Sequence, residues 1–209
     1  MTDTITLVGL SGSGKSTIAE PIAERLGRPL IDVDAAIEEH AGADPSTIIH
    51  ERGEGVFRQL EVEAVERASK VDGAVIATGG GAVIDPLNRW ALWHSGAVAW
   101  LDAPDDVLLE RLARHYKPRP LLEGNAAERL ATLRKTRAPY YRAADVHVDA
   151  TAPVEQVIET VIGRATNGVG RSRRLYDAEL QQDHPMVPPT GRVVFGEHLD
   201  EAAFADVLS

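Results

Sequence analysis

The sequence has no cysteine among its 209 residues. This absence excludes disulfide bonds, thiolate metal sites and a cysteine nucleophile, and it fits a reducing compartment. We therefore expect a cytoplasmic location. The apolar content of 44% is ordinary for a chain that folds around a buried core, and the length favours one domain with an appendage.

Long apolar runs and a basic leader are also missing. No run reaches the roughly 18 residues that a membrane-spanning helix needs. The first four residues carry no basic segment and lead directly into a short apolar run, so no signal peptide is expected. The net charge of -10 argues against a broad nucleic-acid surface. We expect a monomer with neither a nucleic acid nor a membrane as partner, although a local basic pocket could still hold a small anion.

The most informative stretch is residues 9–17, which has the form G-x-x-x-x-G-K-S and lies between an apolar run and a helical pattern. This context is the one that a phosphate-binding loop requires. Its glycines let successive backbone N–H groups point at phosphate oxygens, and the following helix adds the positive end of its dipole. The lysine is expected to reach the terminal phosphates and the serine hydroxyl to bind Mg²⁺. The predicted nucleotide-binding residues of the loop are Gly12, Ser13, Gly14, Lys15, Ser16 and Thr17.

Short apolar runs alternate with helical patterns along most of the chain. Strands are predicted at residues 5–8, 29–34, 73–78, 97–102 and 146–149. Helices are predicted at 15–26, 35–41, from 45 onward, and at 57–70, 104–114, 126–137 and 153–164. This alternation predicts an α/β fold, a five-stranded parallel sheet with helices on both faces in a three-layer α/β/α sandwich.

Ligands of such sheets bind beyond the carboxyl ends of the strands. Four of the predicted strands deliver Gly9, the pair Asp32 and Asp34, Gly79–Gly81 and Asp102 to that edge. The two aspartates are two apart on one predicted strand, so both should point to the same face. One acid would then serve a Mg²⁺-bound water and the other a substrate hydroxyl. The alternative is a solvated pair in which Asp34 caps the next helix.

Arg58 and Glu61 are three apart on a predicted helix and are therefore neighbours. They could form a surface ion pair worth less than about 1 kcal/mol. The functional alternative is an arginine that its glutamate holds toward an anionic substrate group. The run Gly79–Gly81 has one glycine more than a tight turn needs, which indicates close approach to the backbone, for example by a ligand that accepts from N–H groups.

Residues 114–120 concentrate positive charge between two predicted helices. This segment is either a solvated loop or a mobile lid that brings an arginine to the triphosphate and excludes water. Arg137 is predicted at the end of a helix, where the helix dipole alone would favour a cation.

Together these stretches resemble the shikimate kinase family, over about residues 4–164. The resemblance is carried by the loop at 9–17, D-x-D at 32–34, G-E-x-x-F-R-x-x-E at 53–61, A-T-G-G-G at 77–81, R-P-L-L at 119–122 and R-A-P-Y-Y at 137–141. It implies a P-loop NTPase fold with a mobile lid. It also implies ATP- and Mg²⁺-dependent phosphorylation of the 3-hydroxyl of shikimate.

The resemblance also implies roles for single residues on the phosphate side. Asp34 would hold the ring hydroxyls and act on the attacking one. Ser16 would bind Mg²⁺ directly and Asp32 through water. Lys15 and, from the lid, Arg119 would contact the transferred phosphate.

On the substrate side, the resemblance implies that Arg58, Arg137 and the backbone at Gly79, Gly80 and Gly81 bind the carboxylate of shikimate, while Glu61 orients Arg58. Arg111 would stack on adenine, although it lies one residue further from Arg119 than is usual in the family.

Some positions depart from the family pattern. Ile49 stands where the family often has phenylalanine, and residues 115–118 are unusual, which leaves room for another polyol, gluconate or a cyclitol, as substrate. A regulatory module that binds nucleotide without turnover is the non-enzymatic alternative. The presence of Lys15, Asp34, Arg58 and Arg119 together argues against it.

We expect a kinase-like domain at residues 1–165 and a C-terminal extension at 166–209. The extension begins with a glycine- and arginine-rich linker and could contain one strand and one short helix. A disordered tail, a packed extension and the remnant of a fused enzyme are all compatible with this pattern.

Overall fold

The computed structural model describes residues 4–114 and 125–166 of the chain. Within this part, five strands form one sheet in the order β2-β3-β1-β4-β5, and every neighbouring pair is parallel. The strands are β1 (Thr4–Val8), β2 (Leu30–Asp32), β3 (Val75–Ala77), β4 (Gly96–Asp102) and β5 (Val146–Asp149). The predicted α/β fold with a five-stranded parallel sheet is confirmed.

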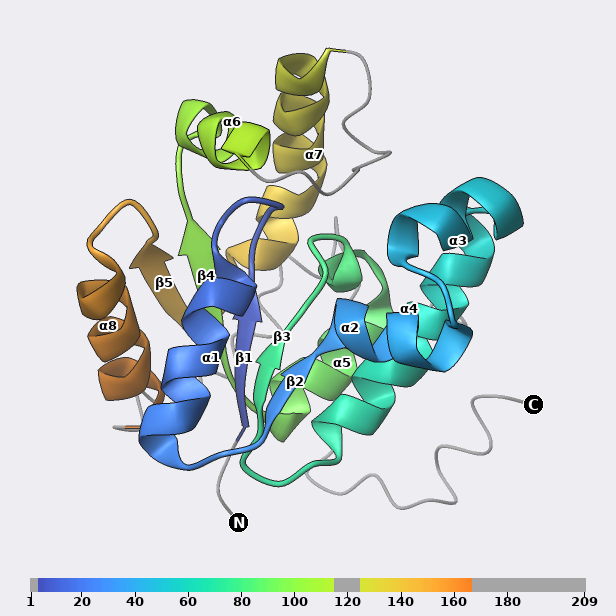
Figure 1. Cartoon of the computed structure of the whole chain (residues 1–209). Coiled ribbons are helices and arrows are strands. Elements are labelled where there is room, and N and C mark those ends of the chain that lie inside the picture. The colour runs from blue at the N-terminus through green and yellow to red at the C-terminus, as the bar shows by residue number, and fades with distance from the viewer. Residues whose placement is uncertain (1–3, 115–124, 167–209) are drawn as a thin grey trace.

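Helices cover both faces of this sheet, as Figure 1 shows. They are α1 (Lys15–Leu26), α2 (Val33–Ala41), α3 (Pro45–Arg52), α4 (Glu54–Ser69), α5 (Pro86–Ser95), α6 (Asp105–Arg114), α7 (Ala126–Tyr141) and α8 (Val154–Thr166), with a short 3₁₀ helix, η1 (Ala82–Ile84). Helices α1 and α8 pack together on one face, and α4 and α5 pack together on the other. Helices α6 and α7 stand beyond the carboxyl ends of the strands (Figure 1).

The central strand β1 explains where the core sits. All five of its residues are buried, and it pairs with β3 on one side and β4 on the other. A strand covered on both faces buries all its side chains, and here Ile5, Leu7 and Val8 supply the apolar ones, while Thr4 and Thr6 are buried as well. Burying it fixes the start of the following glycine loop at the carboxyl edge of the sheet.

Residues 29–34 do not form one strand as predicted. Strand β2 ends at Asp32, and α2 begins at Val33, so Asp34 lies in the first helical turn. Asp32 is the residue that caps α2, through its Oδ1 and the Ala35 N–H at 3.2 Å. The prediction that both aspartates point to one face of a strand was therefore wrong, because the side chain of Asp32 ends the strand by capping the helix.

Two other segments differ from the predictions. Helix α7 continues through Pro139 to Tyr141, so Arg137 lies inside the helix and not at its end. No element is predicted for residues 82–95, which form η1 and α5. An aspartate cap followed by proline, Asp85 and Pro86, starts α5 in the same way that Asp44 and Pro45 start α3.

Among the described residues, no helix has the length and apolar character required to cross a bilayer. The predicted lid with Arg119 and the extension after residue 166 lie outside the described residues. The predicted domain boundary at 165 therefore stays a prediction.

Candidate active site

The glycine loop at the end of β1 has the backbone that the motif requires. Gly9, Gly12 and Gly14 have φ values of 145°, 85° and 93°. A Cβ on Gly9 would lie 2.5 Å from the Leu101 carbonyl oxygen, and one on Gly12 would lie 3.0 Å from the Leu108 oxygen. The loop is therefore pressed against the end of β4 and against α6, where only glycine fits.

Lys15 is buried under this loop, with 9% of the residue exposed. Its ammonium donates to the carbonyl oxygens of Gly9 at 2.8 Å and Leu10 at 2.9 Å. These bonds offset the cost of burying the charge and hold the amine beside the inner side of the loop. A cation in this position is suited to phosphate oxygens that enter the loop.

The two residues predicted for the metal lie together. The Ser16 hydroxyl donates to Asp32 Oδ2 at 2.7 Å, while the other oxygen of Asp32 caps α2. The cap fixes the direction of the carboxylate, and so one oxygen stays aimed at the first turn of α1. A hydroxyl and a carboxylate are hard oxygen donors of the kind that Mg²⁺ prefers.

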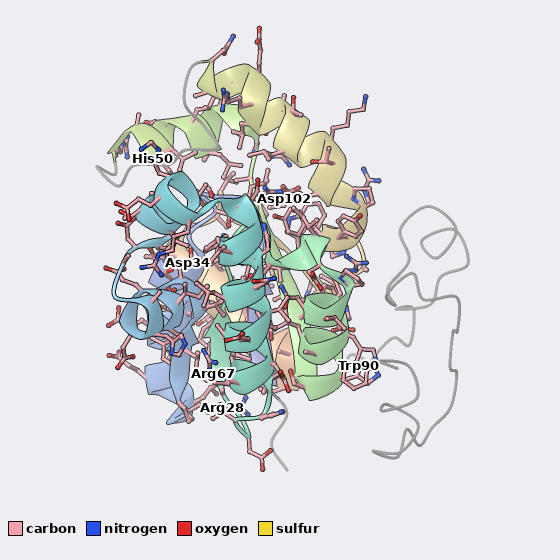
Figure 2. The ribbon with its side chains drawn as sticks, turned by 90° about the vertical axis from the view of Figure 1, so that its right-hand side faces the viewer. Arg28, Asp34, His50, Arg67, Trp90 and Asp102 are labelled. Carbon is pink, nitrogen blue, oxygen red and sulfur yellow. The ribbon has the colours of Figure 1, made fainter. Side chains whose placement is uncertain are left out.

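Asp34 and Glu61 approach the backbone of the glycine turn after β3. A Cβ on Gly79 would lie 2.8 Å from Asp34 Oδ1 and 3.0 Å from Glu61 Oε1. None of Gly79, Gly80 and Gly81 has a positive φ, so these glycines serve close approach and not a left-handed turn. In Figure 2, Asp34 and Asp102 lie closer to α6 and α7 than do Arg28 and Arg67, which mark the opposite end of the molecule.

Arg58 is held by two carboxylates on α4. It donates to Glu61 at 2.7 Å and to Glu54 at 2.9 Å. Glu61 is buried, with only 1% exposed. The pair is therefore not a surface ion pair, which was one of the two predictions from the sequence. Burial raises the pKa of Glu61 and nearby Asp34 raises it further, whereas Arg58 works to lower it. Burial lowers the pKa of Arg58, but the charges and hydrogen bonds of Glu61 and Glu54 together outweigh burial and raise the pKa overall.

Arg137 reaches the same turn from α7. It is 4% exposed and donates from one terminal nitrogen to the Gly80 carbonyl oxygen at 2.9 Å. Burial and the nearby Arg58 lower its pKa from the usual arginine value. The guanidinium of Arg58 lies 2.5 Å from the position of a Cβ on Gly81. The two arginines therefore meet at adjacent glycines, although they come from different helices.

The glycine turn also touches the phosphate loop. A Cβ on Gly80 would lie 3.2 Å from the backbone nitrogen of Ser11. The phosphate loop, the carboxylate of Asp34 and the two arginines thus surround a single turn. The sequence predicts that the phosphate loop, Asp34 and the glycine turn share one edge of the sheet, and the structure brings them together there.

Arg111 donates from α6 to the Ala150 carbonyl oxygen at 2.6 Å, in the segment after β5. This contact directs it toward the side of the phosphate loop away from the glycine turn.

Two site-proximal residues are absent from the sequence predictions. Tyr141 donates its hydroxyl to the Gly80 oxygen at 2.5 Å. Arg134 pairs with Asp102 at 2.8 Å and Asp105 at 2.5 Å, which ties α7 to the end of β4 and the start of α6. Residues 134, 137 and 141 are three and four apart, so their side chains lie on one face of a continuous helix. The sequence prediction ended this helix at residue 137 and therefore did not place Tyr141 on that face.

A glycine loop that opens a helix, together with an acid and a paired-arginine anion site on a parallel sheet, defines a nucleotide-dependent phosphotransferase of the P-loop class. A family model described as shikimate kinase matches residues 11–166. The chain therefore belongs to the shikimate kinase family, whose members use ATP. A shikimate kinase of Symbiobacterium thermophilum is 46% identical over 147 residues, covering 69% of this chain and 84% of that protein.

Solved structures agree with this assignment. Shikimate kinase from Acinetobacter baumannii in complex with shikimate is 34% identical, with a TM-score of 0.72 over 78% of this chain and 94% of that one. The enzyme from Aquifex aeolicus is 32% identical, with a TM-score of 0.69 over 79% and 96%. A gluconokinase from Sinorhizobium meliloti, at 23% identity and a TM-score of 0.51, shares the fold alone.

Replacing Gly79 with alanine should displace Asp34, because the new methyl group would sit within 2.8 Å of its carboxylate. We expect kcat with shikimate to fall by at least ~10-fold while the fold is kept, since small misplacements of reacting groups are costly. Gly55→Ala is the matched control, because a Cβ there meets nothing within 4 Å. Steady-state kinetics and circular dichroism check the pair. Wild-type kcat in Gly79→Ala would contradict this account of the turn.

The two carboxylates that hold Arg58 should contribute unequally to shikimate binding. Glu61→Gln removes the buried partner, and Glu54→Gln removes a partner that is 52% exposed. We expect KM for shikimate to rise by ~10-fold in the first variant and by less than ~2-fold in the second, because exposed ion pairs contribute little. Equal effects of the two changes on KM would contradict the claim that the buried carboxylate contributes more than the exposed one.

The raised pKa of Glu61 gives the same variant a signature in folding stability. A carboxyl whose pKa is raised in the folded protein contributes stability that is fully present below its unfolded value of 4.5 and is lost as the pH rises through the folded value. The unfolding free energy of wild type minus Glu61→Gln should therefore decrease as the pH rises from ~4 to ~7. Urea denaturation at several pH values measures it, and a difference that stays constant or grows would contradict the assignment.

Proposed function

We propose that this protein transfers the terminal phosphoryl group of ATP to the 3-hydroxyl of shikimate, giving shikimate 3-phosphate and ADP. The meeting of Arg58 and Arg137 at the glycine turn beside Asp34 is the observation that supports it most strongly. The site offers two cations and one carboxylate within reach of a phosphate loop. A small ring that carries both a carboxylate and hydroxyl groups matches this set.

The arginines bind the carboxylate of the substrate. Guanidinium groups recognise carboxylates through paired N–H donors, and neither arginine is free to turn, because Glu61 holds Arg58 and the Gly80 oxygen holds Arg137. The backbone at Gly79–Gly81 lies between these side chains. Its lack of side chains leaves room for the substrate ring to approach.

Asp34 acts on the attacking hydroxyl. The first turn of α2 holds it next to Gly79, so a ring bound through its carboxylate presents a hydroxyl to this aspartate. The carboxylate orients the hydroxyl and accepts its proton as the new O–P bond forms. Phosphoryl transfer depends mainly on positioning and charge stabilisation, which suits a site with one acid and several cations.

The phosphate loop, Lys15 and α1 hold the triphosphate. Ser16 and Asp32 fit Mg²⁺, because their oxygens lie 2.7 Å apart and face the start of α1. Bound Mg²⁺ would neutralise charge on the phosphate oxygens. Arg111 stacks on the adenine near Ala150. Arg119, which lies outside the described residues, contacts the transferred phosphate.

The direct test is ADP release from Mg²⁺-ATP with and without shikimate, for wild type and Asp34→Asn. We expect shikimate-dependent release in wild type and a loss of at least ~100-fold in kcat in the variant, because general-base catalysis is worth that much. The control is Asp72→Asn at an exposed position before β3, which should keep wild-type rates.

Further arms of this assay separate the alternatives. Chelation of Mg²⁺ should abolish turnover, and added Mg²⁺ should restore it. Gluconate in place of shikimate should give no ADP. Faster turnover of gluconate than of shikimate, or ATP binding without turnover of either, would overturn the proposed function.

A further inference from the structure

Tyr141 has a contact with the carboxylate site that the mechanism above does not use. It is the last residue of α7 and is 2% exposed. Its hydroxyl donates to the Gly80 carbonyl oxygen at 2.5 Å, and Arg137 donates to the same oxygen at 2.9 Å. Tyr141 and Arg137 thus donate to the same acceptor, the Gly80 carbonyl oxygen.

The geometry of the peptide unit carries this contact into the substrate site. The carbonyl of Gly80 and the N–H of Gly81 belong to one planar trans unit, in which they point in opposite directions. The described residues contain no cis peptide bond. A residue that fixes the Gly80 oxygen therefore fixes the direction of the Gly81 N–H as well. Glycine has the freest backbone of all residues, so this unit has most to gain from an external hold.

We propose that Tyr141 is a positioning residue for the bound carboxylate, acting through the Gly80–Gly81 peptide unit, which Arg137 also holds. This inference rests on the proposed function, because it assigns the carboxylate of shikimate to Arg58, Arg137 and this backbone. Tyr141 itself does not touch the substrate.

The packing around the Tyr141 ring indicates that its hydroxyl, and not the ring, is the group needed at this position. The Trp100 ring stacks on it at 5.8 Å between centroids, with 21° between the planes. A phenylalanine would fill this space equally well, and a buried hydroxyl costs free energy unless it is bonded. Burial also raises the pKa of Tyr141, which keeps the phenol protonated and able to donate to Gly80.

The test is Tyr141→Phe, which removes only the hydroxyl and keeps the ring. We expect KM for shikimate to rise by ~10-fold, because the hydrogen bond from the Gly81 N–H to the charged carboxylate is weakened, with KM for ATP changed by less than ~2-fold. Since the carboxylate contacts are the same in the ground state and the transition state, kcat should fall by no more than ~3-fold. The matched control is Tyr140→Phe, whose ring lies over Arg89 at 4.4 Å and not beside Gly80. It should keep the wild-type KM.

This split separates positioning from stability, because a variant that is only less stable loses kcat and keeps KM. Calorimetric titration of shikimate into folded Tyr141→Phe, at a temperature where near-ultraviolet circular dichroism shows native packing, should give a matching ~10-fold rise in Kd. Unchanged KM and Kd for shikimate, or an equal rise in both KM values, would overturn the inference. Absence of shikimate turnover in wild type would instead overturn the proposed function.

Discussion

The site depends on how closely side chains approach the backbone of residues 79–81. Asp34 and Glu61 lie within 3.0 Å of the place where a Cβ on Gly79 would be, and Arg58 lies 2.5 Å from that place on Gly81. Any larger residue would push these groups away from the turn. The turn is also in contact with the phosphate loop through Ser11. The acid, the arginines and the phosphate loop can reach one small substrate only because residues 79–81 have no side chains. Steric fit at this turn therefore comes before the arrangement of charge.

Charged side chains of both signs lie around this turn. Glu61 lies between a cation and an acid: it pairs with Arg58, and its pKa is raised by burial and by Asp34. Arg137 is buried, and among the described residues it forms no ion pair with a carboxylate but donates to a carbonyl oxygen. Its Nε is buried and makes no hydrogen bond to the part of the chain that the structure describes. A buried guanidinium with unused donors is costly unless an anion completes it, so the protein holds free energy here that a bound carboxylate recovers. The substrate carboxylate thus supplies the anionic partner that the buried Arg137 guanidinium needs.

Much of this could be predicted from the sequence, and the failures have physical causes. Helix α1 and strand β5 have the predicted bounds, because their periodic patterns and caps are local. The Arg58–Glu61 pair followed from helical spacing, but its burial did not, since burial depends on α2, α3 and α5 packing against α4. The pattern 29–34 looked like one strand because nothing local shows that Asp32 caps the helix. Helix α7 passes Pro139 because Arg137 and Tyr141 bond to Gly80, a contact about 60 residues away in the chain.

The measurement that tests the central claim most directly is a crystal structure of this protein with shikimate and ADP. The account predicts that the carboxylate lies between Arg58 and Arg137, within hydrogen-bond distance of both guanidinium groups, and that a ring hydroxyl lies against Asp34. A carboxylate bound elsewhere, or a ring whose hydroxyl groups all point away from Asp34, would contradict it.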